Sequence, residues 1–581
     1  MKAYPLYPQR RSIDLSGIWD FAFFKDAIPC DLEFDPEKIP DEKTVWTKQV
    51  VPGCFDAAGD YTGKRGIGFY RRSVYVNEPG RVCLKIGAIS ICGKIFWDGK
   101  ELAFDDLPYS GVAYEFDAAA GQHELLIAVE NRYNTDLTPL FAPNYDFHGF
   151  GGILRSIELE SLPGQRFGRC TVETVDLSGR VRLDVELPGI KNAVDVDVAI
   201  APYGAVAQSS VLNVRKTLTA NENGVASFEL DIPDVKLWSV QTPNLYTVTL
   251  KMPTDTLIER FGVRTIETKN AKFYLNGEVI QVQGYNRHES HPEFGASLPV
   301  ALMMEDLQML KSMNCNFVRG CHYPQDQVFL DLCDEMGMLV WEESLGWGNN
   351  AEALNYEKFR SKQVEQTALM VRNSRNHPSI ILWGFLNECH SHLPECRTLI
   401  TEMVKTIRDF DTSRPVTFAS MMIAYGEQCL DLVDVISCNT YPGWYGTALY
   451  CDDPFALIKD RFEEVIREVS TDALKDKPLI ISEIGAAALY GCHDRMRIQW
   501  TEEFQMDYIT EVCNQISGHP RIQGLALWHF ADARTYTGGG SLNRTRGFNN
   551  KGSLDEYRRE KLAADAVRKI FAGKLFGDVE D

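Results

Sequence analysis

The chain has 581 residues, of which 44% are hydrophobic and 24% are charged, a composition typical of soluble globular proteins rather than of disordered or fibrous ones. Its 81 acidic and 60 basic side chains give a formal net charge of −21 at pH 7, the wrong sign for a nucleic-acid binder or a protein of anionic membrane surfaces. No apolar run of about 18 residues occurs, and residues 1–12 hold no apolar core. We therefore expect no nucleic-acid partner, no membrane contact, no secretory signal and a cytoplasmic location.

The 15 cysteines are an odd number and include no C-x-x-C pair. This pattern predicts free thiols in small buried side chains, instead of a disulfide framework or a zinc ribbon.

Three regions with different hydrophobic patterns predict three domains. Residues 1–162 consist of short alternating apolar and polar runs broken by turn residues, which is typical of a β-sandwich. Residues 163–265 carry a second set of alternating runs, and a length of about 100 residues suits an immunoglobulin-like sandwich. In residues 266–581, apolar strand-like runs alternate with longer helical patterns, which predicts a parallel sheet covered by helices.

Eight such strand-like runs lie in the third region, the number that closes a (β/α)8 TIM barrel. The active site of such a barrel lies at the C-terminal ends of its strands, so polar residues at those ends are the first candidates for chemistry. The runs begin at Val282, Asn316, Leu339, Ile380, Val416, Val435, Leu479 and Gly524.

Two carboxylates stand at the ends of predicted strands four and seven, namely Glu388 and Glu483. Glycoside hydrolysis requires such a pair, because one carboxyl protonates the leaving oxygen while the other attacks the anomeric carbon, and a separation of about 5–5.5 Å gives retention. Either glutamate alone could equally form an ion pair with a rim arginine.

The surrounding motifs resemble those of glycoside hydrolase family 2. Residues 376–383 leading into Asn387 and Glu388 look like the acid/base signature of that family, and the resemblance spans nearly the whole chain. It implies a jelly-roll sugar-binding fold for the first sandwich. The other matching blocks are residues 68–72, 146–155, 284–289, 319–324 and 478–485.

The resemblance implies that Glu388 is the general acid/base, that Glu483 is the nucleophile and that Asn387 donates to the 2-hydroxyl of the sugar. His322, in the block 319–324, is a further substrate-binding candidate. The chemistry then sets the surroundings: Glu388 needs an apolar or negative environment to stay protonated, whereas Glu483 needs hydrogen-bond donors or a cation to stay ionised.

Asn549 and Lys551 resemble the N-x-K signature of β-glucuronidases within this family. An amide and an ammonium can share a sugar carboxylate through charge-assisted hydrogen bonds. A polar loop with a solvated lysine is the alternative interpretation of these residues.

Other segments resemble β-glucuronidases as well. They imply substrate contacts from Asn439, Tyr441, Tyr445 and Trp528, although aromatic residues at a barrel mouth could be packing alone. By the same resemblance, Asp146 holds a hydroxyl at the far end of the sugar.

One departure concerns the arginine that in this family precedes N-x-K by four positions. That position holds Thr545, with Arg544 and Arg546 one residue away on either side, and we take Arg546 as the candidate. The 4-hydroxyl, which this arginine would contact, is the only stereochemical difference between glucuronate and galacturonate.

The sequence therefore predicts a retaining β-hexuronidase acting on a small glycoside, with β-glucuronide hydrolysis first and β-galacturonide or dual activity as the alternative. A β-galactosidase and a non-catalytic carbohydrate-binding protein are the remaining alternatives. The resemblance also implies a homo-oligomer, and the short segment 346–362 predicts an open entrance to the site.

Motifs for other chemistries are missing. His288 and His291 are three residues apart, whereas the metal-binding H-E-x-x-H helix places its histidines four apart. There is no Gly-rich phosphate loop and no G-x-S-x-G elbow. We expect neither a metal nor a cofactor.

Overall fold

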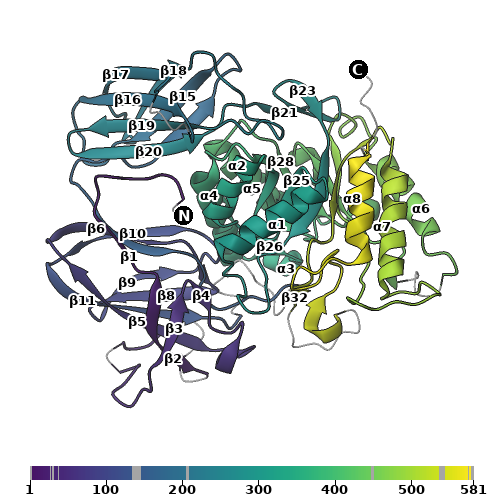
Figure 1. Ribbon diagram of the computed structural model, residues 1–581, viewed down its shortest axis with the longest axis horizontal. Coiled ribbons are helices and arrows are strands. Elements are labelled where there is room, and N and C mark those ends of the chain that lie inside the picture. Colours follow the sequence, from purple (N-terminus) through teal and green to yellow (C-terminus); the bar gives the residue numbers. More distant parts are fainter. Residues whose placement is uncertain are drawn as a thin grey trace.

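The computed structural model describes residues 3–25, 28, 32–36, 38–133, 146–204, 209–446, 451–535, 544–573 and 575–576. They form two β-sandwiches and a closed parallel barrel, and both sandwiches lie on one side of the barrel (Figure 1). The predicted fold class is confirmed in all three parts.

The first sandwich packs a four-stranded sheet, in the order β1-β13-β6-β10, against a six-stranded sheet, in the order β3-β2-β5-β11-β8-β9. Strands such as β10 alternate half-buried and exposed residues, so one face of the sheet turns toward the core. The strands are β1 (Ser12–Asp14), β2 (Gly17–Phe24), β3 (Thr47–Val51), β5 (Ile67–Val76), β6 (Gly80–Ile86), β8 (Cys92–Trp97), β9 (Lys100–Asp105), β10 (Val112–Ala118), β11 (Gly121–Glu130) and β13 (Ile157–Ser161), with a small sheet of β4 (Gly53–Cys54), β7 (Ile89–Ser90) and β12 (Gly152–Ile153).

The second sandwich has a three-stranded sheet, β14-β15-β18, and a four-stranded sheet, β17-β16-β19-β20. Leu6 pairs with Ile258 of β20, and Arg10 binds both Glu160 of the first sandwich and Asp255 of the second. The chain start therefore ties the sandwiches together, and the boundaries at residues 162 and 265 stay predictions. The strands are β14 (Cys170–Thr174), β15 (Arg180–Glu186), β16 (Val194–Pro202), β17 (Leu212–Leu218), β18 (Val225–Asp231), β19 (Tyr246–Met252) and β20 (Asp255–Phe261).

The barrel closes through eight parallel strands, β24 to β31, in chain order, and all eight predicted runs are confirmed as these strands. They are β24 (Val282–Arg287), β25 (Phe317–Gly320), β26 (Leu339–Trp347), β27 (Ile380–Asn387), β28 (Val416–Ser420), β29 (Ile436–Asn439), β30 (Leu479–Glu483) and β31 (Ile522–Leu527). The α-helices are α1 (Val300–Ser312), α2 (Gln327–Met336), α3 (Ala351–Asn355), α4 (Glu357–Ser374), α5 (Cys396–Phe410), α6 (Ala456–Glu468), α7 (Glu502–Ile516) and α8 (Leu562–Ala572). Two small sheets flank the barrel in sequence, namely β21 (Ile266–Lys269), β22 (Lys272–Leu275) and β23 (Glu278–Ile280), and β32 (Ala533–Arg534) with β33 (Phe548–Asn549).

Close packing inside the barrel explains the composition of β27. Every residue of this strand is buried, as expected for a parallel strand covered on both faces. A Cβ atom on Gly384 would lie 1.9 Å from Nε1 of Trp341, so only glycine fits at this position. Such packing fixes the strand that leads to Glu388.

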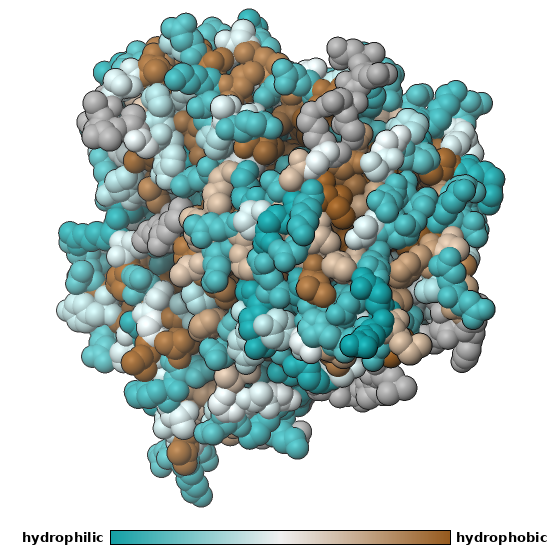
Figure 2. Space-filling view, turned by 45° about the vertical axis from the view of Figure 1, so that its right-hand side comes forward, coloured by the Kyte–Doolittle hydropathy of each residue, from teal (hydrophilic) through white to brown (hydrophobic). Residues whose placement is uncertain are grey.

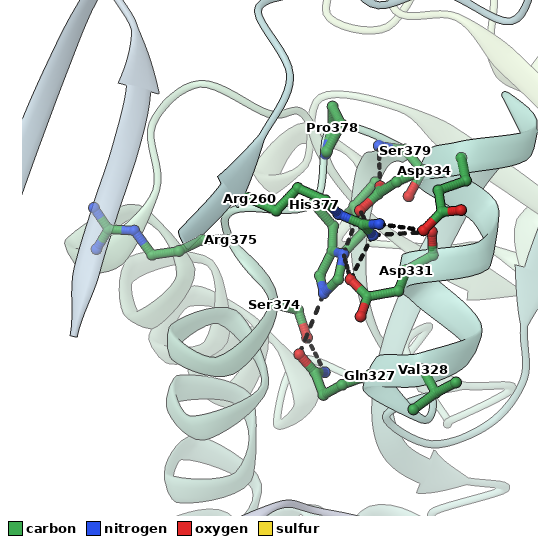
Figure 3. Close-up of polar contacts among 12 residues, drawn as sticks. Arg260, Gln327, Val328, Asp331, Asp334, Ser374, Arg375, His377, Pro378 and Ser379 are labelled. Carbon is green, nitrogen blue, oxygen red and sulfur yellow. Dashed lines mark hydrogen bonds and ion pairs between the residues drawn. The ribbon is translucent and has the colours of Figure 1, made fainter. Parts of the chain in front are cut away.

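A buried ionic network joins the second sandwich to the start of β27 (Figure 3). Arg260 of β20 donates to Asp331 at 2.5 Å and to Asp334 at 3.3 Å, both on α2. His377, which lies just before β27, is 2.6 Å from Asp334 through Nδ1, and Ser379 donates its backbone N–H to the same carboxylate. The network therefore connects β20 of the second sandwich, helix α2 and the start of β27.

The first sandwich contacts the opposite end of the barrel, where the strands finish. Arg155 donates to Glu289, just beyond β24, at 3.0 Å, and Tyr109 stacks on Tyr323 with ring centroids 4.0 Å apart. Asp146 belongs to the same sandwich, so its side chain reaches the mouth of the barrel from outside it.

On the face drawn in Figure 2, hydrophilic side chains cover most of the surface and apolar ones are scattered in small patches. In the described part of the chain, no helix combines the length and the apolar character needed to cross a membrane.

Candidate active site

A cavity of about 1110 Å³ opens at the C-terminal ends of the barrel strands. It is lined by eight of the twelve residues singled out in the sequence, namely Asp146, Glu388, Asn439, Tyr441, Tyr445, Glu483, Trp528 and Lys551. Both sandwich and barrel therefore contribute to one site. Beyond the two glutamates, the cavity continues over Met421, Met422 and Tyr425 toward α6.

Glu483 ends β30 and is surrounded by hydrogen-bond donors. Arg319 donates to Oε1 at 2.8 Å, and the Tyr441 hydroxyl donates to Oε2 at 2.7 Å. Burial raises the pKa of Glu483 to about 7, while Arg319 and Tyr441 oppose that rise. These are the donor and cation that an ionised nucleophile needs.

Arg319 of β25 is fully buried and hydrogen-bonds to several polar residues at the base of the site. Its guanidinium pairs with Glu343 of β26, with N–H···O distances of 2.8–3.0 Å, besides its bond to Glu483. The same group donates to Asn387 at 2.9 Å and to Asn286 at 3.1 Å. Burial opposes the charge of Arg319, but the two carboxylates outweigh it and raise its pKa.

The motifs of the sequence predict no role for Arg319, Glu343 or Asn286, although Arg319 lies in the block 319–324. The available signal was an arginine inside an apolar barrel strand, because an arginine is almost never fully buried unless it is paired.

Glu388 follows β27 with a backbone φ of +51°, in the left-handed region, and its side chain is half-buried at the cavity. Asn439 donates to Oε1 at 3.0 Å. Burial, followed by the charges of Glu483 and Asp146, raises the pKa of Glu388 to about 8. Its pKa thus lies above that of Glu483, the order that an acid paired with an ionised nucleophile requires.

Asn387 is buried behind the cavity. Its Oδ1 accepts from Arg319 and from Asn439, at 2.9 and 3.0 Å, and this fixes the orientation of the amide. Its Nδ2 has no hydrogen-bond partner in the described part of the chain. An oriented and unused donor therefore lies beside Glu388.

His322 lies beneath the cavity rather than in its lining. Its ring stacks on Trp528 with centroids 5.3 Å apart and planes at 18°, and Nδ1 is 2.9 Å from Glu343. Burial and Arg319 hold the pKa of His322 well below 6.5, so the ring is neutral. In this position it supports Trp528, which lines the site.

A second set of polar residues gathers away from the glutamates. Lys551 Nζ is 2.5 Å from the Tyr445 hydroxyl and lies over the Tyr441, Tyr445 and Trp444 rings, at 4.7–5.7 Å from their centroids. Burial lowers the pKa of Lys551. Among the described residues, no carboxylate lies within ion-pair distance of this ammonium.

Asp146 closes the same region from the sandwich. It forms a bidentate ion pair with Arg544 and accepts from Asn549 Nδ2 at 2.8 Å. Arg544 also points NH1 toward the Tyr445 hydroxyl at 3.4 Å. Asn549, itself 1% exposed, thus lies behind the cavity lining.

The structure corrects one residue of the expected set. Arg546 lies outside the cavity lining and pairs with Glu556 at 2.9 Å, with its side chain half exposed. Arg544 lines the cavity in its place. The reason is local: Arg546 has φ +63° inside a 3-10 turn (Thr545–Gly547), which sends the two arginines in different directions.

Two groups of side chains in the described residues have the ligand types and spacing that a metal ion could use. One, His288 with Cys321 and His322, lies under Trp528; the other consists of Asp331, Asp334 and His377. In the second group Arg260 already pairs with both carboxylates, and His377 pairs with Asp334 (Figure 3).

Comparisons with known proteins agree with this geometry. The family profile described as "Glycosyl hydrolases family 2, TIM barrel domain" matches residues 266–569, and the one described as "Glycosyl hydrolases family 2" matches residues 169–264. Curated beta-glucuronidases of Streptococcus agalactiae and Homo sapiens are 27% and 25% identical over 97% of this chain, covering 97% and 92% of their own lengths.

Two solved structures share the whole architecture. A GH2 beta-galacturonidase from Eisenbergiella tayi bound to galacturonate has a TM-score of 0.86 and 28% identity, covering 99% of this chain and 98% of its own. A Faecalibacterium prausnitzii beta-glucuronidase also has a TM-score of 0.86, with 25% identity and coverage of 98% and 99%. The chain belongs to glycosyl hydrolase family 2.

Proposed function

We propose that this protein hydrolyses terminal β-linked hexuronides with retention of configuration. The observation that carries the proposal is the buried Lys551 ammonium. An unpaired buried charge is costly, and it persists where a ligand supplies the missing partner. A sugar carboxylate is the ligand that fits beside Tyr445.

Charge balance supports an anionic sugar. Asp146 and Arg544 neutralise one another as an ion pair, and no carboxylate among the described residues pairs with Lys551. One hexuronate carboxylate restores neutrality, whereas the hydroxymethyl group of a neutral hexose cannot. The second set of polar residues therefore favours a hexuronidase over a galactosidase.

The two glutamates suit a double displacement. Glu483 attacks the anomeric carbon while Glu388 protonates the leaving oxygen, which gives a covalent glycosyl-enzyme. Esterification removes the charge of Glu483, one of the causes that raise the pKa of Glu388. Glu388, which has already given its proton to the leaving group, then stays ionised and accepts a proton from the water that releases the sugar.

Asn387 completes the reacting end. Its Nδ2 is oriented by Arg319 and Asn439 and has no partner in the described residues, so it is free to donate to the 2-hydroxyl. Hydrogen bonds to that hydroxyl strengthen in the transition state of glycoside hydrolysis.

Galacturonide hydrolysis is the second candidate. Arg544 rather than Arg546 lines the cavity, and the Eisenbergiella tayi relative was solved with galacturonate. Activity on both epimers is consistent with this arrangement.

The test compares aryl β-glucuronide, β-galacturonide and β-galactoside with the wild type and with Lys551→Met. We expect kcat/KM to be highest on a uronide, and Lys551→Met to lower it by about two to three orders of magnitude, because losing one partner of a buried charge pair costs about 2–5 kcal/mol. Lys459→Met, on the exposed face of α6, is the matched control and should change neither substrate.

Two results would contradict the proposal. A galactoside cleaved faster than both uronides would exclude a hexuronidase. Equal losses on uronide and galactoside in Lys551→Met would show that the lysine is structural.

We further propose a cytoplasmic homo-oligomer with an open entrance. The described cysteines are all free thiols, which fits a reducing compartment. Of the segment 346–362, Trp347 lines the cavity, while most of the remainder folds into α3 and the start of α4. The oligomeric state rests on the family resemblance alone.

A further inference from the structure

Three cysteines meet directly behind the general acid, and the proposed reaction does not use them. Cys389 follows Glu388 in the chain, Cys396 is the first residue of α5, and Cys429 lies between β28 and β29. The Sγ atoms of Cys389 and Cys396 are 3.8 Å apart, and Cys429 lies close enough to Cys396 to raise the pKa of that thiol. All three side chains are fully buried.

This cluster is held by the loops that border the cavity. Cys429 Sγ donates to the backbone oxygen of Ser391 at 3.4 Å, and the Ser391 hydroxyl donates to Glu427. The two loops, residues 388–396 and 421–429, are thereby bound to each other. Met421 and Met422 of the second loop line the cavity.

We propose that Cys389 and Cys396 form a reversible redox pair whose oxidation by a peroxide lowers hydrolysis by displacing Glu388. The regulatory part of this inference rests on the hydrolytic function proposed above, whereas formation of the bond does not. Cys396 is the resolving thiol because its Sγ lies 3.8 Å from that of Cys389.

The chemistry balances with peroxide as the sole oxidant. The Cys389 thiolate attacks one peroxide oxygen, the O–O bond breaks, and the products are a sulfenic acid and one water after proton uptake. The Cys396 thiol then attacks that sulfur, the S–S bond forms, and the sulfenic oxygen leaves as a second water. Two thiols are oxidised and one peroxide is reduced to two waters.

The geometry connects this bond to catalysis. A disulfide needs an S–S distance of about 2.05 Å, so the two sulfurs must approach by about 1.8 Å. Cys389 is bonded to Glu388, whose backbone already occupies the left-handed region at φ +51°. Displacing a catalytic group by about 1 Å can cost about 10²-fold in rate.

Burial sets the speed of the modification. Cys389, the thiol that meets the peroxide, is fully buried, so the oxidant reaches it only when the 388–396 loop opens locally. The neighbouring sulfur of Cys389, that of Cys429 and burial also raise the pKa of Cys396. The exposed Cys451 is an internal reference for a thiol that needs no opening.

The experiment treats the full chain with hydrogen peroxide, then removes the oxidant. Tryptic mass spectrometry maps disulfides, and an aryl β-hexuronide reports kcat before and after dithiothreitol. We expect a Cys389–Cys396 bond, a fall in kcat of about 10²-fold and recovery on reduction. Cys396→Ser and Cys389→Ser should retain activity after peroxide, whereas Cys513→Ser, a buried thiol on α7 without a sulfur neighbour, should respond like the wild type.

Three outcomes would overturn the inference. The first is that the active wild type loses activity after peroxide without forming a Cys389–Cys396 bond. The second is that the bond forms between Cys396 and Cys429 instead. The third is that the Cys389–Cys396 bond forms but kcat does not change. If the reduced protein cleaves no hexuronide, the mapped bond still decides whether the redox pair exists, so failure of the proposed function is distinguishable.

Discussion

At the scale of single residues, the two glutamates share burial but differ in their neighbours. Glu483 receives a guanidinium and a phenol, whereas Glu388 receives one amide and faces the charge of Glu483. These contacts divide the roles of two chemically identical side chains.

The pH dependence of kcat/KM follows from this division. Below about pH 7 Glu483 gains a proton and loses its nucleophilicity, and above about pH 8 Glu388 loses the proton it must donate. We expect a narrow maximum between these limits, whose apparent values belong to the coupled pair.

Tyr441→Phe tests the acid limb of this profile. The Tyr441 hydroxyl stabilises ionised Glu483, so its removal should raise the pKa of Glu483 and move the acid limb to higher pH. Tyr445→Phe, which removes a hydroxyl bonded to Lys551, should mainly raise KM and leave the limb in place. An acid limb that stays put or moves down in Tyr441→Phe would contradict the assigned contact.

Sequence reasoning located the glutamates because a strand-end position is readable from the strand pattern. It assigned no role to Arg319 and Glu343, since their importance lies in contacts between β25, β26 and β30 that no spacing within one strand reveals. The role of a buried charged residue such as Arg319 can be inferred only once the residues that it pairs with are known.

At the scale of elements, the turn Thr545–Gly547 places Arg544, and not Arg546, in the cavity lining. Arg544 and Arg546 each lie one residue from the position of the family arginine, so the sequence gave no basis for choosing between them. The left-handed φ of Arg546, unusual for a non-glycine residue, resolves the choice by rotating its side chain toward Glu556.

Paired substitutions test this element. Arg544→Ala should lower kcat/KM on uronides by about 10²-fold or more, because Asp146 then remains partly buried without its cation, and such losses cost about 2–5 kcal/mol. Arg546→Ala removes a half-exposed ion pair and should leave kcat/KM within about twofold. The reverse ranking in a steady-state assay on both uronide epimers would restore Arg546 to the site.

The barrel strands were predictable for a physical reason. Parallel strands covered on both faces become continuous apolar runs, and β27 is buried at every residue. The irregular end of the same strand was not predictable, because Leu386 and Glu388 adopt positive φ, at +47° and +51°, only under the constraint of neighbouring strands.

At the scale of the whole molecule, catalysis is proposed to depend on two domains that meet at the barrel mouth. Asp146 lies 398 residues from Arg544 in the chain, and the contact between them spans the domain boundary. The resemblance to the family predicted that Asp146 contributes to the site, whereas composition and periodicity do not predict it. The buried Arg155–Glu289 pair holds the same interface.

Arg155→Met tests that interface. The change leaves Glu289, 2% exposed, without its guanidinium partner, and breaking a buried pair costs about 3–5 kcal/mol. We expect a lower urea midpoint for unfolding together with reduced kcat, whereas Arg11→Met, which removes an exposed pair with Glu78, should change neither. Equal midpoints for Arg155→Met and the wild type would show that the sandwich docks without this pair.

The buried ammonium of Lys551 has a consequence for turnover as well as for selection. Cleavage alters the anomeric end of the sugar and leaves its carboxylate unchanged, so the freed hexuronate can make the same contact with Lys551 as the substrate. Departure of the product leaves the buried Lys551, which lies over the Tyr445 and Trp444 rings, without that carboxylate. We therefore expect the free hexuronate to inhibit the enzyme competitively, so that the rate it sustains depends on how quickly that acid is removed.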